Sequence, residues 1–225
     1  MTKDDRSEAR TARSVAAPAR QLWLVRHAET EWSRAGRHTG RTDLPLTADG
    51  ERMARDIATL LEGRRFAAVW SSPLLRARRT CELVGLGEPA IDEDLLEWNY
   101  GEYEGLTSAE IERRRPGWNL WRHGCPGGET LAQVNDRAQR VVARVLREFD
   151  AATHAHDASA DGVSLAIVSH GHFLRTLVAA WLELPPSRAR SFGLHADSVS
   201  ILGFEHGDRV VWSWDWTEHL TAAGH

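Results

Sequence analysis

Residues 22–32 read LWLVRHAETEW, and this stretch decides what fold to expect. Leu22–Val25 is an unbroken apolar run, which predicts a strand buried on both faces of a parallel sheet. Arg26 and His27 follow directly, so the strand would deliver a guanidinium and an imidazole to the carboxyl edge of the sheet. Ligands bind at this edge in open α/β sheets, and an imidazole can attack a phosphoryl group that a guanidinium holds.

The composition of the 225-residue chain limits the classes of partner. Its hydrophobic fraction of 42% and charged fraction of 27% are typical of a globular protein. The net charge of −4 argues against a general nucleic-acid-binding protein, which would usually be basic. No apolar run approaches the length of a membrane span, so we expect no membrane partner. Cys81 and Cys125 form neither a disulfide framework nor a metal pattern, which favours a reducing, cytoplasmic location.

The distribution of polar and apolar residues predicts one domain. Residues 1–20 are polar and read as a disordered extension, residues 21–218 as the domain, and residues 219–225 as a tail. Within the domain, residues 98–128 are rich in Gly, Trp and Arg, and we expect an irregular segment that covers the substrate.

Apolar periodicity predicts strands that alternate with helices. The expected strands are 22–25, 67–70, 90–95 and 163–168, with a hairpin of 198–204 and 210–214. The first expected helix is capped by Thr47 and ends at Leu61. The second has Pro73 in its first turn and continues through 74–84. Further helices are expected at 108–115, 130–149 and 173–182, with a loop at 150–162. This alternation predicts a three-layer α/β/α sandwich with a mostly parallel central sheet.

Four of the predicted strand ends carry reactive side chains. Arg26 and His27 follow the first strand, and Arg76 lies one turn inside the helix after the second. Glu97 follows the third strand and His170 the fourth. Parallel strands would bring all five to one edge. Arginine matches the oxygens of a phosphate with paired donors, neutral imidazole is a nucleophile, and a carboxyl can protonate a departing alkoxide. The set therefore suits phosphoryl transfer.

At this point the sequence resembles the histidine phosphatase superfamily, also called the phosphoglycerate-mutase-like family. Six motifs carry the resemblance in order along residues 21–204. They are LVRHAETEW (24–32), TGRTDLPLT (39–47), SSPLLRARRT (71–80), LLEWNYGEYEGL (95–106), GGET (127–130) and SHGHFLR (169–175). Within the family the chain is most similar to the acid phosphatase and sedoheptulose-bisphosphatase-like branch.

The resemblance implies a phosphoglycerate-mutase-like fold and a hydrolase that needs no metal and no cofactor. It would act on small phosphate esters, the small phosphorylated metabolites of a cell. His27 would attack phosphorus and become a phosphohistidine, while Arg26, Arg76 and His170 would bind the equatorial oxygens. Glu97 would protonate the leaving oxygen and then activate water.

Further residues are expected to bind substrate. Besides Arg26, Arg76 and His170, they are Ser33, Thr39, Gly40, Arg41, Trp98, Tyr100 and Gly171. Core packing is an equally good explanation for the two aromatic residues. Arg34 and Arg41 are candidates for binding a second anionic group. His170 and His172 form an H-x-H pair, but without carboxylate or cysteine partners this is weak evidence for a metal.

Three alternatives remain at this stage. The protein could be a mutase of the phosphoglycerate type, a phosphatase specific for sugar bisphosphates, or a phosphate-binding protein without activity. Only about thirty residues separate Glu97 from Gly127, and so short an insert leaves the pocket open to water and favours hydrolysis. The sequence leaves the oligomeric state open, although the Trp-rich carboxyl-terminal strands could form a homodimer interface.

Overall fold

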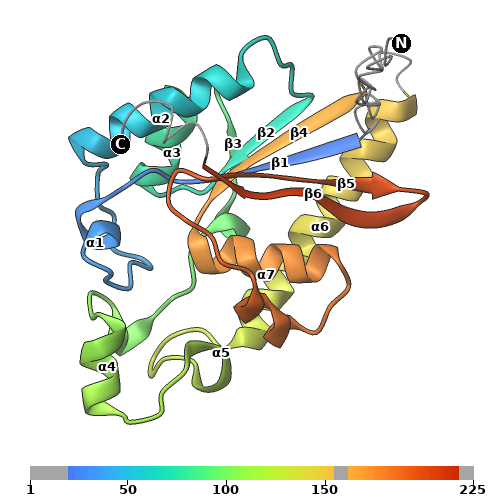
Figure 1. The fold of residues 1–225 in the computed structure, drawn as a ribbon. Helices are drawn as coiled ribbons and strands as arrows, with labels where there is room; N and C mark the ends of the chain where they lie inside the picture. Colours follow the sequence, from blue (N-terminus) through green and yellow to red (C-terminus); the bar gives the residue numbers. More distant parts are fainter. Residues whose placement is uncertain (1–19, 155–161, 218–225) are drawn as a thin grey trace, which may run out of the picture.

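The computed structural model describes residues 20–154 and 162–217 (Figure 1). In this part of the chain a six-stranded sheet has the order β3-β2-β4-β1-β5-β6. The strands are β1 (Arg20–Arg26), β2 (Ala68–Ser71), β3 (Ala90–Ile91), β4 (Val163–Ser169), β5 (Val199–Glu205) and β6 (Asp208–Trp216). β1 to β4 pair in parallel, whereas β5 and β6 form the antiparallel hairpin at one edge. The mostly parallel sheet is as predicted.

Helices cover both faces of this sheet (Figure 1). The α-helices are α1 (Glu31–Arg34), α2 (Ala48–Leu61), α3 (Leu75–Leu83), α4 (Ser108–Arg114), α5 (Leu120–His123), α6 (Leu131–His154) and α7 (Gly171–Trp181). Three short 3₁₀ helices, η1 (Glu93–Leu95), η2 (Gly101–Tyr103) and η3 (Pro186–Ser191), complete the described elements. α2 and α3 pack on one face and α6 and α7 on the other, which confirms the three-layer sandwich.

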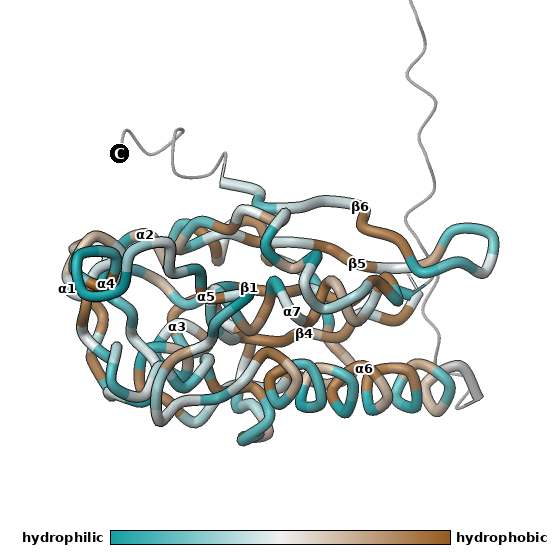
Figure 2. Tube along the Cα trace, turned by 90° about the horizontal axis from the view of Figure 1, so that it is seen from below, coloured by the Kyte–Doolittle hydropathy of each residue, from teal (hydrophilic) through white to brown (hydrophobic). Residues whose placement is uncertain are grey.

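Strand β1 explains why the apolar run of the sequence is unbroken. Leu22 and Leu24 pack against α6 and α7, while Trp23 and Val25 pack against α2 and α3. Successive strand residues point to opposite faces, so a strand between two helix layers needs apolar residues at every position. Figure 2 shows how hydropathy differs between buried and surface elements: β4 and α7 are hydrophobic along most of their length, whereas hydrophobic and hydrophilic residues alternate along α6.

Several predicted boundaries are wrong. The third strand ends at Ile91, because Asp92 caps η1 by accepting a hydrogen bond of 2.9 Å from the backbone N–H of Asp94. Pro73 precedes the N-cap residue Leu74 and so lies outside α3. α7 begins at Gly171, two residues earlier than predicted. Thr47 does cap α2, since its side chain accepts a hydrogen bond of 2.9 Å from the N–H of Gly50.

The segments on either side of α6 also differ from expectation. The sequence predicts one short helix within 98–128, whereas the structure has α4, α5 and η2 there. α6 continues to His154, so the first five residues of the predicted loop at 150–162 are helical. Residues 155–161 of that loop, residues 1–19 and the predicted tail at 219–225 lie outside the described residues. Arg20 belongs to β1 rather than to the extension. No helix in the described ranges has the length and apolar character to cross a membrane.

Candidate active site

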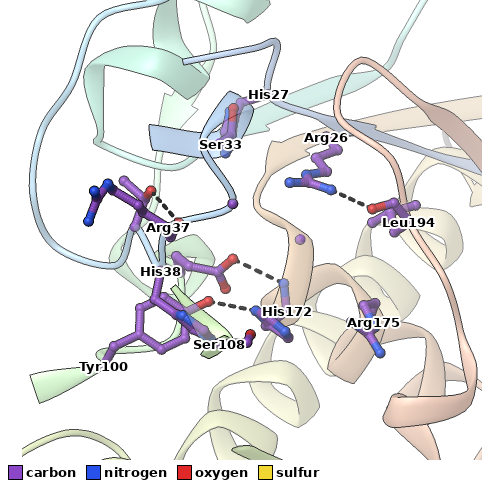
Figure 3. Close-up of a pocket in the computed structure, with 14 residues that line it drawn as sticks. Arg26, His27, Ser33, Arg37, His38, Tyr100, Ser108, His172, Arg175 and Leu194 are labelled. Carbon is purple, nitrogen blue, oxygen red and sulfur yellow. Dashed lines mark hydrogen bonds between the residues drawn. The ribbon is translucent and has the colours of Figure 1, made fainter. Parts of the chain in front are cut away.

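A pocket of about 210 Å³ opens where β1 and β4 end (Figure 3). β1 leads into His27, and β4 leads through His170 into Gly171 at the start of α7. Arg26, His27, Glu97 and Gly171 all line the pocket. The sequence thus predicted correctly which sheet edge holds the cavity.

His27 is buried and held as one tautomer. Its Nδ1 lies 2.8 Å from the carbonyl oxygen of Ala28, and a carbonyl only accepts, so Nδ1 carries the proton and donates it. Burial, together with the charges of Arg76 and Arg26, holds the pKa of His27 well below its usual value. The ring is therefore neutral, and Nε2 keeps the lone pair that a nucleophile needs.

Arg26 has a buried donor without a protein partner. Its Nη1 donates to the carbonyl of Leu194, while its buried Nε makes no hydrogen bond to any described residue. Burial lowers the pKa of Arg26, and the charge of Glu97 opposes this. A buried donor without an acceptor is costly, so an anion that accepts from Nε would stabilise the site.

Arg76 and His170 lie deeper, behind the pocket wall. Arg76 is fully buried; Nη1 donates to the carbonyl of Thr42 (2.9 Å), and Nη2 donates to those of Thr39 (3.1 Å) and Gly40 (2.9 Å). Its Nε donates to Nδ1 of His170 at 3.2 Å. Nε2 of His170 therefore carries the ring proton and donates to Oγ of Ser72 at 2.7 Å.

These bonds give Arg76 two effects on the site. It fixes the loop around Thr39 and Gly40, and its charge helps to keep His27 and His170 neutral by lowering the pKa of each. The His27 and His170 rings lie 5.1 Å apart between centroids, so the two imidazoles are neighbours, as the sequence predicts.

Glu97 is held at the amino end of α7. Oε1 accepts hydrogen bonds from the backbone N–H groups of Trp98 (2.8 Å) and Phe173 (2.9 Å), and Oε2 accepts one from that of His172 (3.0 Å). The side chain is 4% exposed and lines the pocket. Oε2 accepts a single bond, so it is the oxygen with room for an acidic proton.

The other residues predicted to bind substrate divide into two groups. Ser33, Thr39, Tyr100 and Gly171 line the pocket, although the Ser33 hydroxyl already caps α1 together with Thr30. Gly40, Arg41 and Trp98 are not among the lining residues. Arg41 faces Glu129 at 3.6 Å, and the buried Trp98 donates its indole N–H to the carbonyl of Glu129 at 2.8 Å.

Among the lining residues that sequence reasoning did not predict as substrate contacts, those with a guanidinium or imidazole side chain are Arg37, His38, His172 and Arg175. His172 and Arg175 lie three positions apart on α7, a spacing that places both on one side of a helix. Because the strand before this helix ends at Ser169, at the edge where the site was expected, that spacing could have identified His172 and Arg175 as pocket residues. Arg37 and His38 stand in an irregular loop, where no period gives the direction of a side chain.

Arg175 is a cation without a described carboxylate in contact. Its Nε donates to the carbonyl of Ala189 (3.3 Å) and its Nη2 to that of Arg190 (3.0 Å), and its guanidinium stacks over the ring of Trp121 at 4.7 Å. Arg34, by contrast, lies between Glu29 and Asp49 and does not line the pocket. Across the described ranges no cluster of three or more His, Cys, Asp or Glu side chains could hold a metal ion.

The family model of the histidine phosphatase superfamily (branch 1) matches residues 22–217. An acid phosphatase of Mycobacterium tuberculosis is 42% identical over 193 residues, which are 85% of this chain and 90% of the relative. A sedoheptulose 1,7-bisphosphatase of Saccharomyces cerevisiae is 37% identical over 186 residues, which are 72% of this chain and 67% of the relative.

A solved structure has the same architecture. That of a mycobacterial glucosyl-3-phosphoglycerate phosphatase aligns with a TM-score of 0.76 and 28% identity, over 88% of this chain and 99% of the other. The family model and this structural similarity both extend over most of the chain, so the assignment to a family does not depend on a few site residues. The chain belongs to branch 1 of the histidine phosphatase superfamily and is a phosphatase of phosphoric monoesters.

Proposed function

We propose that the protein hydrolyses small phosphate esters through a phosphohistidine at His27, without a metal. The observation that carries the proposal is the pairing of a neutral His27, whose Nε2 lone pair is free, with Arg26, whose buried Nε lacks an acceptor. A phosphoryl group between them would accept from Arg26 while Nε2 attacks phosphorus.

In the first step the Nε2–P bond forms and the P–O bond of the ester breaks. Glu97 gives a proton from Oε2 to the leaving oxygen, and the positive charge that develops on His27 is compensated by the phosphoryl oxygens. Arg26 and Arg76 neutralise the charge on those oxygens, which is usually the largest contribution to catalysis in such sites.

In the second step water attacks phosphorus and the P–N bond breaks. The Glu97 carboxylate takes the proton of the water, so phosphate leaves and both His27 and Glu97 return to their starting states. His170 and Arg76 now bond to protein groups. Direct contact with the phosphoryl group would require each to exchange one of these bonds for one to the ligand.

The proposal also favours substrates that carry a second anionic group. Arg175 lines the pocket and its hydrogen bonds go to carbonyls alone, so its charge is available to a ligand. The relative named as a bisphosphatase makes a second phosphate a reasonable choice. In the sequence-based hypothesis this task fell to Arg34 and Arg41, but both have carboxylates nearby and neither lines the pocket.

The experiment that tests the proposal follows the adduct. Protein mixed with 4-nitrophenyl phosphate in chelator is quenched in base, digested and searched by mass spectrometry for a phosphoryl group at His27. We expect the adduct and steady release of phosphate from the native protein, and neither from His27→Ala. Turnover by His27→Ala, or turnover that stops in chelator, would overturn the proposal.

We further propose that the protein works in a reducing, cytoplasmic setting. Cys81 and Cys125 are free thiols in buried positions, and burial raises the pKa of each to about 12, so neither is primed to form a disulfide. Thiol titration should find two free thiols only after unfolding, and a disulfide in the purified native protein would contradict this.

A homodimer through the hairpin is a second proposal about the assembly. β6 is the outer strand of the sheet, and Trp212 on it is 38% exposed. Light scattering should give twice the chain mass for the native protein and the chain mass for Trp212→Lys. A monomeric native protein would rule the dimer out.

A further inference from the structure

The pocket continues into a second cavity, which we call the outer chamber. It measures about 470 Å³ and shares His38, Ser108 and His172 with the pocket. Trp118 lies on its wall and Glu112 at its exposed side, between α4 and α5. The ring of His172 therefore lies where the pocket and the outer chamber meet, and an ester whose alcohol part extends from the pocket into the chamber would lie beside it.

The side chain of His172 is fixed by Tyr100. The phenol oxygen of Tyr100 lies 2.6 Å from Nδ1 of His172 (Figure 3). Tyr100 is 2% exposed, and burial raises the pKa of its phenol well above the usual value, so the phenol keeps its proton. No other described residue accepts that proton, so the phenol donates it to Nδ1 of His172.

An imidazole that accepts at Nδ1 carries its own proton at Nε2. Burial lowers the pKa of His172 well below the usual value, so the ring is neutral and holds this single proton. In the described part of the chain no group accepts a hydrogen bond from Nε2. The ring is also confined: Trp121 lies 5.3 Å away at a tilt of 58°, and His38 stacks parallel to it at 6.2 Å.

The backbone of His172 fixes where this ring stands relative to the proposed acid. Its N–H donates to Oε2 of Glu97, the oxygen that would protonate the leaving group. The ring of the same residue would thus lie close to the oxygen of a leaving group that Glu97 protonates, and to the first atoms of the alcohol part.

We propose that Tyr100 and His172 select the substrate: Tyr100 holds His172 as its Nε2–H tautomer, and Nε2–H donates to an oxygen in the alcohol part of the ester. His172 would contact the substrate, and Tyr100 is a positioning residue. The ligand class is a phosphate ester whose alcohol carries an ether, hydroxyl or carbonyl oxygen a few bonds from phosphorus. The inference rests on the proposed function and names its substrate class.

A matched pair of substrates isolates this hydrogen bond. 2-Methoxyethyl phosphate and butyl phosphate have the same length and the same kind of leaving group, and differ by one oxygen in place of a methylene. One neutral hydrogen bond is worth about 0.5–1.5 kcal/mol, so we expect the native protein to prefer the methoxyethyl ester by about 2- to 13-fold in kcat/KM, mainly through KM.

Variants then assign the preference. Tyr100→Phe and His172→Phe should lose the preference for the methoxyethyl ester. His172→Gln should keep part of this preference, because the amide N–H of glutamine also donates a hydrogen bond. Tyr103→Phe is the control, since Tyr103 is the only other tyrosine of the chain and packs on Trp118 rather than on His172. Equal preference in the native protein and Tyr100→Phe, or none in the native protein, overturns the inference.

A spectroscopic measurement covers the case in which Tyr100→Phe folds poorly. In ¹⁵N-histidine-labelled native protein, His172 should give the chemical shifts of the Nε2–H tautomer. A shift pattern with the proton on Nδ1 contradicts the inference. Phenyl phosphate, which has no acceptor oxygen beyond the ester, separates the two proposals. If the native protein does not hydrolyse phenyl phosphate, the proposed function is wrong. If it hydrolyses phenyl phosphate but does not distinguish the methoxyethyl ester from the butyl ester, only this inference is wrong.

Discussion

Oε2 of Glu97 accepts a hydrogen bond of 3.0 Å from the backbone N–H of His172, a residue 75 positions further along the chain. Phe173 donates to Oε1 in the same way at 2.9 Å. The amino end of α7 thus holds the carboxyl, and the same turn of chain carries His170 and Gly171. A helix amino terminus offers free N–H groups, so the position of Glu97 depends on where β4 ends.

Replacing Glu97 by Gln should slow hydrolysis according to the leaving group. General acid catalysis is worth about 10²–10⁴-fold, so the barrier for alkyl esters should rise by about 3–5 kcal/mol. Nitrophenolate leaves without a proton, so nitrophenyl phosphate should be affected much less. The measurement is kcat/KM on both esters. An equal loss on the two would contradict the role of Glu97.

Replacing Gly171 by Ala should damage catalysis without damaging the fold. A Cβ there would meet Cζ of Arg26 at 3.2 Å and Nε at 3.3 Å, so the guanidinium would have to move by a few tenths of an ångström. Misplaced groups are costly, and we expect kcat/KM to fall by about tenfold or more while Tm holds or rises. Gly193→Ala is the control, because nothing lies within 4 Å of its Cβ. Similar activity in both variants would contradict this account of Arg26.

Replacing Arg175 by Ala should weaken binding of substrates with two anionic groups. A hydrogen bond to a charged group is worth about 1.5–3 kcal/mol, so KM for butane-1,4-diol bisphosphate should rise by about 10- to 150-fold. KM for butyl phosphate should change little. Arg41→Ala is the matched comparison, because Arg41 faces Glu129 and does not line the pocket. A larger effect from Arg41→Ala would restore the sequence-based hypothesis.

Replacing Asp197 by Asn should change how stability depends on pH. Burial raises the pKa of Asp197 from 3.8 to about 7, and the charge of Arg26 opposes this. A raised pKa in the folded state means that stability present below about pH 4 is lost as the pH rises through about 7, by up to about 4 kcal/mol. Asn tolerates the backbone there, where φ is 60°.

The measurement for Asp197→Asn is Tm at pH 5 and at pH 8. The variant should gain on the native protein as the pH rises, because only the native protein has to ionise the buried carboxyl of Asp197. A constant difference between the two proteins across this range would show that Asp197 has the same pKa folded and unfolded.

The sequence by itself determined the layers and the edge where the site forms. The apolar run Leu22–Val25 and the stretch Val163–Val168, which is apolar apart from Ser164, indicated strands covered on both faces, and parallel strands end at a common edge. It also indicated Arg26 and His27 as the strand-end pair. Local signals carried these predictions, because periodicity and capping depend on residues that are close in the chain.

Only the tertiary structure decided which cations face the cavity. Arg41 and Arg175 have equal charge, but Arg41 faces Glu129, whereas Arg175 lines the pocket from α7. The tautomers of His27 and His172 likewise depend on Ala28 and Tyr100, and Tyr100 is 72 residues from its partner. Hydrogen bonds and burial between distant segments set charge and proton position, and no local pattern in the sequence encodes them.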